Sequence, residues 1–399
     1  TDGGTNWEKT LYIDEYHGVS DMDIAPDNPN ILFAAMWRFE RKPWTHRTGS
    51  EEGGIFKSTD GGKSWRKIEA GLPKLVGRIG VKIAPSNPDV VYVITESDEG
   101  TLFRSNDKGE TFTKVTDEVG IVSRGLYYTD MRVDPADENR LYAVSSLLQR
   151  SIDGGKTWSR IAPSIHIDFH SMWIDPTSPQ RMWVGQDGGV AFSLNHGDNW
   201  TPARTLPLGQ FYQVFADNGS GPFYRVGGGL QDNGTWIGPA SSREIAGVYT
   251  DDWHMFSFGD AYWVVPHPTD ENIFISEAQG GAIFRTNLAN RQQLDINPQT
   301  RRNDGGPVGD LEYRFNWNSP IIQSPHDPLT VYFGGNVVFK TTDFGDTWSA
   351  ISPDLTTNDE TKQGPAGGPA WYENTVAEWH TTIISPVSYT HLTLPTIGY

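Results

Sequence analysis

Hydrophobic runs recur along the chain in pairs, and a short polar turn that contains proline joins the two runs of each pair. The 3.6-residue period of an amphipathic helix is nearly absent, so the pattern predicts two consecutive strands for each pair. Seven copies occur, the fifth of them looser than the others. They occupy residues 22–35, 81–94, 131–144, 172–185, 213–228, 263–276 and 321–334.

A second pattern follows several of these pairs and reads Ser/Thr-x-Asp-x-Gly-x-Ser/Thr-Trp. In such a turn the Asp side chain caps the backbone, and the Gly accepts a positive φ. The flanking strands then form a hairpin, whose Trp can fill the space between neighbouring sheets. We therefore interpret these aspartates as turn formers rather than catalytic groups. Clear copies begin at Ser58, Ser105, Ser151 and Thr341, a truncated copy covers 2–7, and a degenerate copy covers 193–200.

Together the two patterns supply four strands in about 40–60 residues, which is the size of one propeller blade. The sequence therefore predicts an all-β chain, a β-propeller of four-stranded antiparallel blades with Asp-containing hairpins.

The composition supports this fold class and narrows the partners. The chain contains 43 Gly and 26 Pro, which favours many turns. Lys and Arg number 32 against 50 Asp and Glu, a net charge of −18 that repels phosphate backbones, so we expect no nucleic-acid partner. There is no Cys, which excludes disulfides and thiolate metal sites, and no apolar run long enough to span a membrane.

The Asp pattern resembles the Asp-box (BNR) repeats of sialidases, sortilin-type receptors and xyloglucanase-type glycoside hydrolases. Three further stretches resemble large bacterial proteins described as sortilin-like or glycosyl-hydrolase-like BNR-repeat proteins. These stretches are residues 209–217 with 229–236, residues 313–355, and residues 362–369. The resemblance covers residues 1–386.

This resemblance implies two tandem propellers. Residues 1–204 would form the C-terminal blades of the first propeller, with three further blades before Thr1, and residues 205–386 would begin the second. The Pro-containing stretch 201–209 suits a linker. The residues alone leave open a single propeller of seven irregular blades. The resemblance also implies a secreted or periplasmic location.

The C-terminal segment departs from the repeat. Residues 387–396 read VSYTHLTLPT, which resembles one reading frame of a transposase sequencing adapter. We expect residues 387–399 to be an assembly artefact rather than native sequence.

One candidate site is His166, Asp168 and His170. Alternate residues of a strand point to one face, and two imidazoles with a carboxylate suit a divalent metal or another ligand. The alternative is a polar strand whose side chains are satisfied by internal hydrogen bonds.

A second candidate is the pair Asp187 and Asp232, which lie in the similar turns QDGG and QDNG. In xyloglucanase-type enzymes two aspartates face each other across a cleft as general acid and general base, and these positions are the most similar ones here. The first-propeller aspartate of those enzymes lies early, in blades that would precede Thr1, which puts the pairing in doubt. The alternative is ordinary turn capping by Asp.

Long loops at 38–54, 297–313 and 352–374 exceed normal connections. Their aromatic and arginine side chains suit sugar rings, although such loops can also pack on a neighbouring propeller. The candidate ligand-binding residues are Trp44, Arg301, Arg302, Trp371 and Tyr372. Most tryptophans outside the Asp pattern lie at expected strand positions and are interpreted as blade core rather than ligand platforms. They include Trp37, Trp173, Trp183, Trp236, Trp253, Trp263 and Trp317.

Two functions fit these features. One is a sortilin-like propeller that binds a protein, peptide or glycan, which we favour. The other is an inverting glycoside hydrolase, which needs two carboxylates about 6.5–9.5 Å apart. The sequence shows no arginine triad or Arg-Ile-Pro stretch, which argues against a sialidase.

Overall fold

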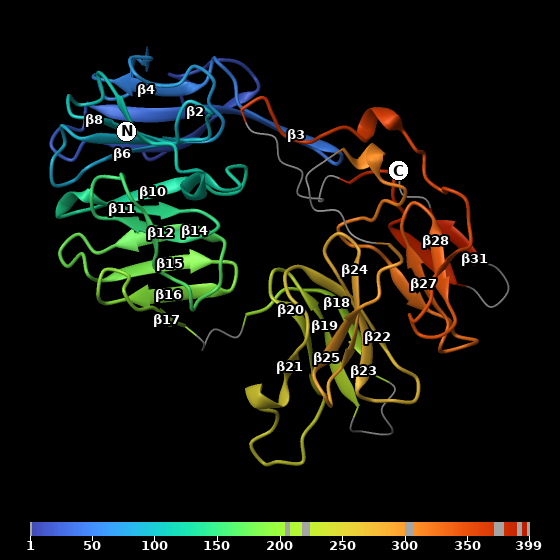
Figure 1. Ribbon diagram of the computed structural model, residues 1–399. Coiled ribbons are helices and arrows are strands. Elements are labelled where there is room, and N and C mark those ends of the chain that lie inside the picture. Colours follow the sequence, from blue (N-terminus) through green and yellow to red (C-terminus); the bar gives the residue numbers. More distant parts are fainter. Residues whose placement is uncertain are drawn as a thin grey trace. The chain divides into compact units, whose positions relative to one another are not determined.

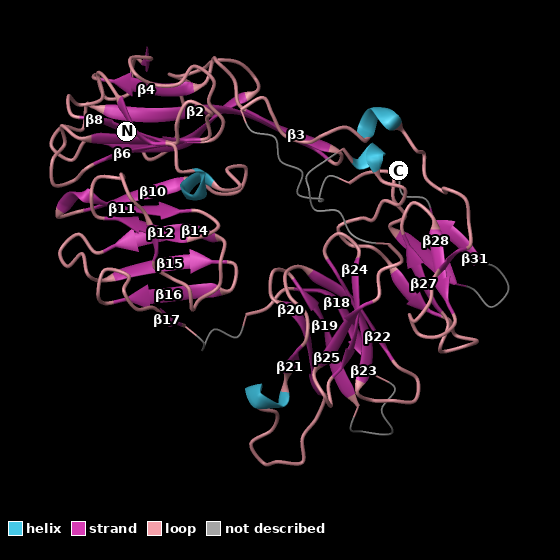
Figure 2. Cartoon of the chain, in the orientation of Figure 1, coloured by secondary structure: helices cyan, strands magenta, loops and turns pink. Residues whose placement is uncertain are grey.

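The computed structural model describes residues 2–203, 208–217, 224–299, 307–370, 379–388 and 393–396. These residues form one five-stranded and six four-stranded antiparallel sheets, and a two-stranded hairpin (Figures 1 and 2). Four short 3-10 helices are the only helices among them, and no helix in this part of the chain could cross a membrane. The predicted class, an all-β protein of propeller blades, is confirmed.

The strands of each blade pair in chain order, from a first inner strand to a fourth outer strand. Blade 1 consists of β1(His17–Ile24), β2(Leu32–Lys42), β4(Gly54–Ser58) and β5(Arg66–Ile68), and blade 2 of β6(Ile79–Ile83), β7(Val91–Thr95), β8(Leu102–Ser105) and β9(Thr113–Thr116). Blade 3 consists of β10(Asp130–Asp134), β11(Asp137–Val144), β12(Leu148–Ser151) and β13(Ser159–Arg160). Blade 4 consists of β14(Phe169–Ile174), β15(Met182–Gln186), β16(Gly189–Ser193) and β17(Thr201–Pro202). A further strand, β3(Thr45–Thr48), pairs with β2.

Three more blades follow, and the terminal hairpin comes after them. Blade 5 consists of β18(Phe211–Ala216), β19(Arg225–Leu230), β20(Gly234–Pro239) and β21(His254–Met255), and blade 6 of β22(Ala261–Pro266), β23(Ile273–Ala278), β24(Ala282–Asn287) and β25(Gln292–Asp295). Blade 7 consists of β26(Ile321–Gln323), β27(Val331–Gly334), β28(Val338–Thr341) and β29(Ser349–Ala350). The hairpin is formed by β30(Ser385–Ser388) and β31(Thr393–Thr396).

The chain divides into two compact units between residues 206 and 207. Unit 1 holds blades 1 to 4 together with residues 367–373, and unit 2 holds blades 5 to 7 together with residues 42–45 and 374–399. Whether each unit is part of a separate propeller stays a prediction.

The Asp boxes have the capping geometry that their sequence predicts. Asp153 accepts hydrogen bonds from the backbone N–H of Lys156 and Thr157 at 3.0 Å, and from the Thr157 hydroxyl at 2.7 Å. Trp158 donates its indole N–H to the Gly155 carbonyl at 2.9 Å. These hydrogen bonds, first that from the Thr157 N–H, lower the pKa of Asp153 to about 2. The boxed aspartates are therefore structural.

The proline turn between the first and second strands is capped by one side chain in most blades. In blade 4 the Asp175 carboxylate accepts the backbone N–H of Thr177 and Ser178. In blade 6 the same place is taken by His267, whose Nδ1 accepts the N–H of Thr269 and Asp270 at 3.3 and 3.1 Å. Both donors are N–H groups, so Nδ1 carries the lone pair and the imidazole is neutral with its proton on Nε2.

This cap makes the stability of unit 2 depend on pH. Burial lowers the pKa of His267, and nearby Arg285 lowers it further while Asp270 opposes them. The folded state therefore disfavours the imidazolium, and stability is lost as pH falls from the unfolded value of about 6.5 through the lower folded pKa. We expect His267→Asp to keep the cap, as Asp175 does in blade 4. Between pH 7.5 and 5 the free energy of unfolding of this variant, measured with urea, should fall less than that of the wild type.

His267→Ala is the matched control, because it removes both the cap and the titration and should cost about 1 kcal/mol at pH 7.5. Equal acid sensitivity of the wild type and His267→Asp between pH 7.5 and 5 would show that His267 is not the responsible group.

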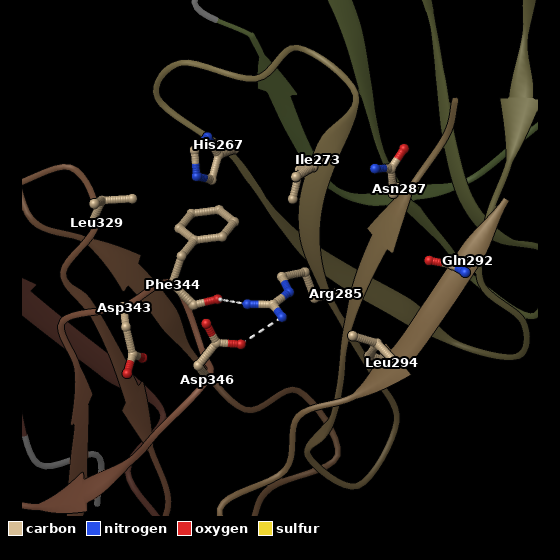
Figure 3. Close-up of a pocket in the computed structure, with 10 residues that line it drawn as sticks. All are labelled: His267, Ile273, Arg285, Asn287, Gln292, Leu294, Leu329, Asp343, Phe344 and Asp346. Carbon is tan, nitrogen blue, oxygen red and sulfur yellow. Dashed lines mark hydrogen bonds and ion pairs between the residues drawn. The ribbon is translucent and has the colours of Figure 1, made fainter. Parts of the chain in front are cut away.

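Neighbouring blades are joined by buried apolar side chains and by a recurrent ionic contact. Arg285, on the third strand of blade 6, donates to the Phe344 carbonyl at 3.2 Å and to the Asp346 carboxylate at 2.6 Å, both in the Asp box of blade 7 (Figure 3). We call this contact the latch. Equivalent latches join Lys57 to Lys108 and Glu110, and Arg150 to His196 and Asp198.

The acceptor of each latch is held in an unusual backbone conformation. The residue that supplies the carbonyl has φ of 60° at Lys108, 56° at His196 and 55° at Phe344. This left-handed conformation turns the carbonyl towards the preceding blade, and the following box Gly completes the turn. The latch therefore couples turn geometry to blade packing.

Blade 4 differs because an aromatic residue replaces the latch cation. Phe192 stands opposite Trp183 in the register, in the place that Arg150 holds opposite Tyr142 in blade 3. Trp183 is 45% exposed and its cross-strand partner Trp173 is 52% exposed. The expectation that these tryptophans are core residues is wrong, since alternation along the strands turns them away from blade 3.

Candidate functional site

Beta-bulges place side chains at one end of the blades. The first strand begins at the same end as the turn between the second and third strands, and the Asp boxes lie at the opposite end. We call the former the site end. A bulge inserts an unpaired residue and re-aims its side chain, and such bulges are common beside functional sites. Register shifts mark bulges at Ser20, His170, Tyr212 and Tyr262–Trp263.

In unit 1 the bulge of blade 4 directs His170 towards the turn that carries Asp187. The His170 Nε2 lies 2.8 Å from an Asp187 carboxylate oxygen. The Tyr128 ring lies 4.9 Å from the imidazole and inclined to it. Burial raises the pKa of Asp187, while the charge of His170 opposes the shift. Two of the predicted residues, His170 and Asp187, are thus brought together.

The expected strand through His166, Asp168 and His170 is wrong. Strand β14 begins at Phe169, and Asp168 has a φ of 65° that no strand residue adopts. His166 contacts the carbonyl of Ile167 through Nδ1. The three side chains therefore do not share a strand face. No group of three His, Asp or Glu side chains in the described ranges is arranged to hold a metal ion, so the metal site has no support from the geometry.

Asp168 nevertheless belongs to the same neighbourhood. Its carbonyl accepts the backbone N–H of Asp187 at 3.3 Å. Burial is the main cause that raises the pKa of Tyr128, and the charge of the Asp168 carboxylate is the second. Tyr128 is therefore a neutral hydrogen-bonding phenol at any physiological pH. The sequence analysis missed Tyr128, because it follows a loop and a short 3-10 helix, η1(Val119–Val122), rather than a recognisable strand.

In unit 2 the corresponding cluster is built around Asp232. Its backbone N–H donates to the Asp260 carboxylate at 3.0 Å, and Asp232 has a φ of 57°. Asp260 is buried, and its other carboxylate oxygen accepts the indole N–H of Trp317 at 2.9 Å. Its own N–H donates to the Gln279 side chain at 2.9 Å. Asp260 thus fixes the turn that presents Asp232.

Two tyrosines cover Asp260 from the first strands of blades 5 and 6. Tyr212 and Tyr262 are stacked with ring centroids 4.5 Å apart. Burial, with a contribution from Asp260, raises the pKa of Tyr212 to about 12 and raises that of Tyr262 further. Both phenols therefore stay protonated and can donate hydrogen bonds next to two carboxylates.

Behind this cluster lies Glu277, which is fully buried. One carboxylate oxygen accepts the Ser319 N–H at 3.0 Å, and the backbone N–H groups of Gly281 and Trp263 also face the carboxyl. Burial raises the pKa of Glu277 well above its usual range.

Asp187 and Asp232 do not occupy equivalent positions. In blade 4 the ladder closes with Gln186 opposite Gly189, so Asp187 is the first residue of a two-residue turn. In blade 5 it closes with Leu230 opposite Gly234, so Asp232 is the middle residue of a three-residue turn. The similarity of QDGG and QDNG conceals this difference. The two aspartates also belong to different units, and each is placed by its own blade.

Of the predicted loop residues, Trp44 has internal contacts in unit 2. His380 packs edge-on against its ring with centroids 5.7 Å apart, and the Lys362 ammonium lies 5.0 Å from the ring centroid. Arg301, Arg302, Trp371 and Tyr372 lie outside the described residues. Their role in binding stays a prediction.

The sequence profile of the BNR/Asp-box repeat matches residues 149–160. Its serine, aspartate, glycine, threonine and tryptophan are those of the box at Ser151–Trp158, whose hydrogen bonds recur in the other boxes. The chain carries BNR/Asp-box repeats on propeller-type blades. No curated protein sequence matches this Asp-box protein.

Several solved structures are similar to the Asp-box protein. The GH74 xyloglucanase from Xanthomonas campestris has 14% identity and a TM-score of 0.36, with 87% of this chain and 47% of that chain covered. YCF48 from Cyanidioschyzon merolae has 15% identity, a TM-score of 0.34, and coverage of 83% and 98%. PorZ of Porphyromonas gingivalis has 12% identity, a TM-score of 0.36, and coverage of 84% and 42%. The Asp-box chain spans about half the length of the xyloglucanase.

Proposed function

We propose that this protein is a ligand-binding propeller whose binding site in unit 2 is centred on Asp232. The observation that carries the proposal is the conformation of Asp232, a left-handed residue whose N–H is held by the buried Asp260 carboxylate. A non-glycine residue in this conformation costs about 1 kcal/mol or more, and such residues cluster at ligand sites where the fold enforces them. Asp232, a partly exposed residue, is thereby presented at the site end of the blade.

The chemistry of the site favours a glycan. The Asp232 carboxylate accepts hydrogen bonds from hydroxyl groups, and the partly exposed Tyr212 and Trp317 supply aromatic surface with polar edges, while Tyr262 is buried behind Tyr212. A peptide N–H or ammonium group is the alternative donor. On the family resemblance we place this binding outside the cytoplasm.

We expect Asp232→Asn to weaken ligand binding about tenfold or more, because it replaces a charge-assisted acceptor by a neutral amide. The test is a glycan array and a peptide-display library probed with the full chain, followed by titration of the best ligand. Asp251→Asn, an exposed acidic residue of the same unit, is the matched control.

Asp260→Asn gives a second readout of the same site. It keeps the size of the side chain but weakens the acceptor that fixes the Asp232 turn, so affinity should fall while Asp232 itself is unchanged. Ligand binding that survives both Asp232→Asn and Asp260→Asn at wild-type affinity would place the site elsewhere.

A glycoside hydrolase is the second candidate, and one observation favours it. Burial raises the pKa of Asp187, which is what a general acid needs, although His170 counteracts the shift. The test is hydrolysis of β-linked polysaccharides by wild type, Asp187→Ala and Asp232→Ala. Undiminished hydrolysis by both variants would remove this pair as the catalytic residues.

A further inference from the structure

A cleft in unit 2 lies between the outer strands of blades 5 and 6, which are labelled in Figure 1, and one of its walls reaches Trp236 beside the Asp232 turn. We call it the rim cleft. Its volume is about 530 Å³, and its walls come from β20, β21, β24 and β25 and the residues beside them. The side chains that matter here are Trp236, Trp253, His254, Met255, Arg291 and Gln293.

The cleft exists because neither blade has an Asp box at its outer turn. In boxed blades a compact turn joins the third and fourth strands and carries the box Trp. In blade 5 residues 240–253 form a longer loop, and in blade 6 a short turn, residues 288–291, joins β24 to β25. The outer strands of the two blades are therefore left with an open space between them.

Two indole rings form the apolar wall of the rim cleft. Trp253 directly precedes β21, as the box Trp precedes the fourth strand elsewhere, and its ring lies over Gly238, where a side chain would collide with it. Trp236 donates its indole N–H to the Asn233 carbonyl at 2.8 Å, which fixes the ring. The expectation that these two tryptophans are core residues is wrong, because both are partly exposed and line the cleft.

The polar side chains of the cleft are cationic or neutral. Gln293 donates its amide N–H to the Phe256 carbonyl at 2.6 Å and to the Thr286 hydroxyl at 3.1 Å, so its carbonyl oxygen remains as an acceptor. Arg291 is exposed and held in a left-handed turn with φ of 58°. The lining residues include no Asp or Glu, in a chain that has 50 of them. An anionic ligand therefore meets the Arg291 guanidinium and no carboxylate among the residues that line the cleft.

From these features we infer that the rim cleft binds an acidic sugar, a uronic acid residue of a polysaccharide. The C–H face of the pyranose ring packs on the indoles, the carboxylate pairs with the Arg291 guanidinium, and the Gln293 carbonyl accepts a hydroxyl proton. A neutral sugar uses the indoles but not Arg291, and an acidic peptide uses Arg291 but has no flat C–H face. The inference makes no use of the Asp232 carboxylate, although Trp236 is hydrogen-bonded to Asn233 in the same turn.

The test is calorimetric titration of the full chain with oligogalacturonate and with a neutral xylo-oligosaccharide of equal length. We expect the acidic oligomer to bind at least tenfold more tightly at low salt, with the difference reduced at 0.5 M NaCl by screening. Arg291→Asn should remove this preference, and Asn tolerates the left-handed turn, so the fold is kept. Arg160→Gln, an exposed cation of unit 1, is the matched control.

Trp236→Leu should weaken both oligomers, because it removes one indole face while Arg291 remains. A Glu-rich peptide serves as the competing ligand. Any of three results would overturn the inference. The first is equal affinity for the acidic and the neutral oligomer, and the second is an unchanged preference in Arg291→Asn. The third is tighter binding of the Glu-rich peptide than of oligogalacturonate. Asp232→Asn should leave oligogalacturonate binding unchanged, so failure here is distinct from failure at the Asp232 site.

Discussion

Glu277→Gln is expected to stabilise unit 2 at neutral pH by about 2 kcal/mol, because it removes a carboxyl that ionises in the unfolded chain but is held protonated by burial in the fold. The folded state raises the pKa of this buried carboxyl above its usual 4.5, so the fold favours the protonated form. Its contribution to stability is therefore fully present below the unfolded pKa and is lost as pH rises towards the folded pKa. Glutamine keeps the acceptor for the Ser319 N–H and carries no charge at any pH.

The measurement is urea unfolding of wild type and Glu277→Gln at pH 5, 7 and 8. The gain should grow with pH, because only the wild type has a carboxyl to ionise. Glu271→Gln, an exposed residue near the start of the same strand, is the control and should change little. A gain that is the same at pH 5 and pH 8 would contradict the assigned cause.

Asp153→Ala is expected to destabilise unit 1 by about 2 kcal/mol or more. The substitution leaves the backbone N–H groups of Lys156 and Thr157 without their acceptor, and removes the partner of the Thr157 hydroxyl. The turn carries Trp158, which packs against the core shared by blades 2 and 3, so the loss should reach both blades. Thermal unfolding followed by tryptophan fluorescence measures it.

The box of blade 4 provides the matched comparison. There Asn195 caps with one oxygen, which accepts the Asn199 N–H at 3.0 Å. Asp153→Asn should therefore lose clearly less than Asp153→Ala, and Asn195→Asp should gain a few tenths of a kcal/mol. If Asn and Ala at position 153 were equally harmful, capping by one oxygen would not be the source of stability.

The blades could be predicted from the sequence because their signals are local. The Asp box and the proline turn each lie within eight or so residues, and both are set by backbone capping and positive φ rather than by distant contacts. Blade 5 was harder to predict from the sequence, since the connection between its third and fourth strands is a loop of residues 240–253 without an Asp box. There only the neighbouring blades and the hydrophobic runs indicated a four-stranded sheet.

The candidate sites could be predicted only in part. The turns that hold Asp187 and Asp232 stand out in the sequence, but their unequal lengths depend on how the hairpins close. Tyr212 and His170 are aimed by bulges, and an extra residue in a strand leaves no signature in composition or spacing. Asp260 follows a glycine before a strand and looked ordinary, because its importance lies in partners far away in the sequence.

The latch has a direction, and that direction bears on how the protein is made. In each latch the cation belongs to the earlier blade and the receiving turn to the later one, as with Arg150 and His196. During synthesis from the N-terminus, the Asp turns of blades 2, 4 and 7 thus meet a cation-bearing strand that has already left the ribosome. In each of these three pairs the earlier blade can serve as the template on which the later blade closes. Blade 4 itself carries Phe192 in place of the cation.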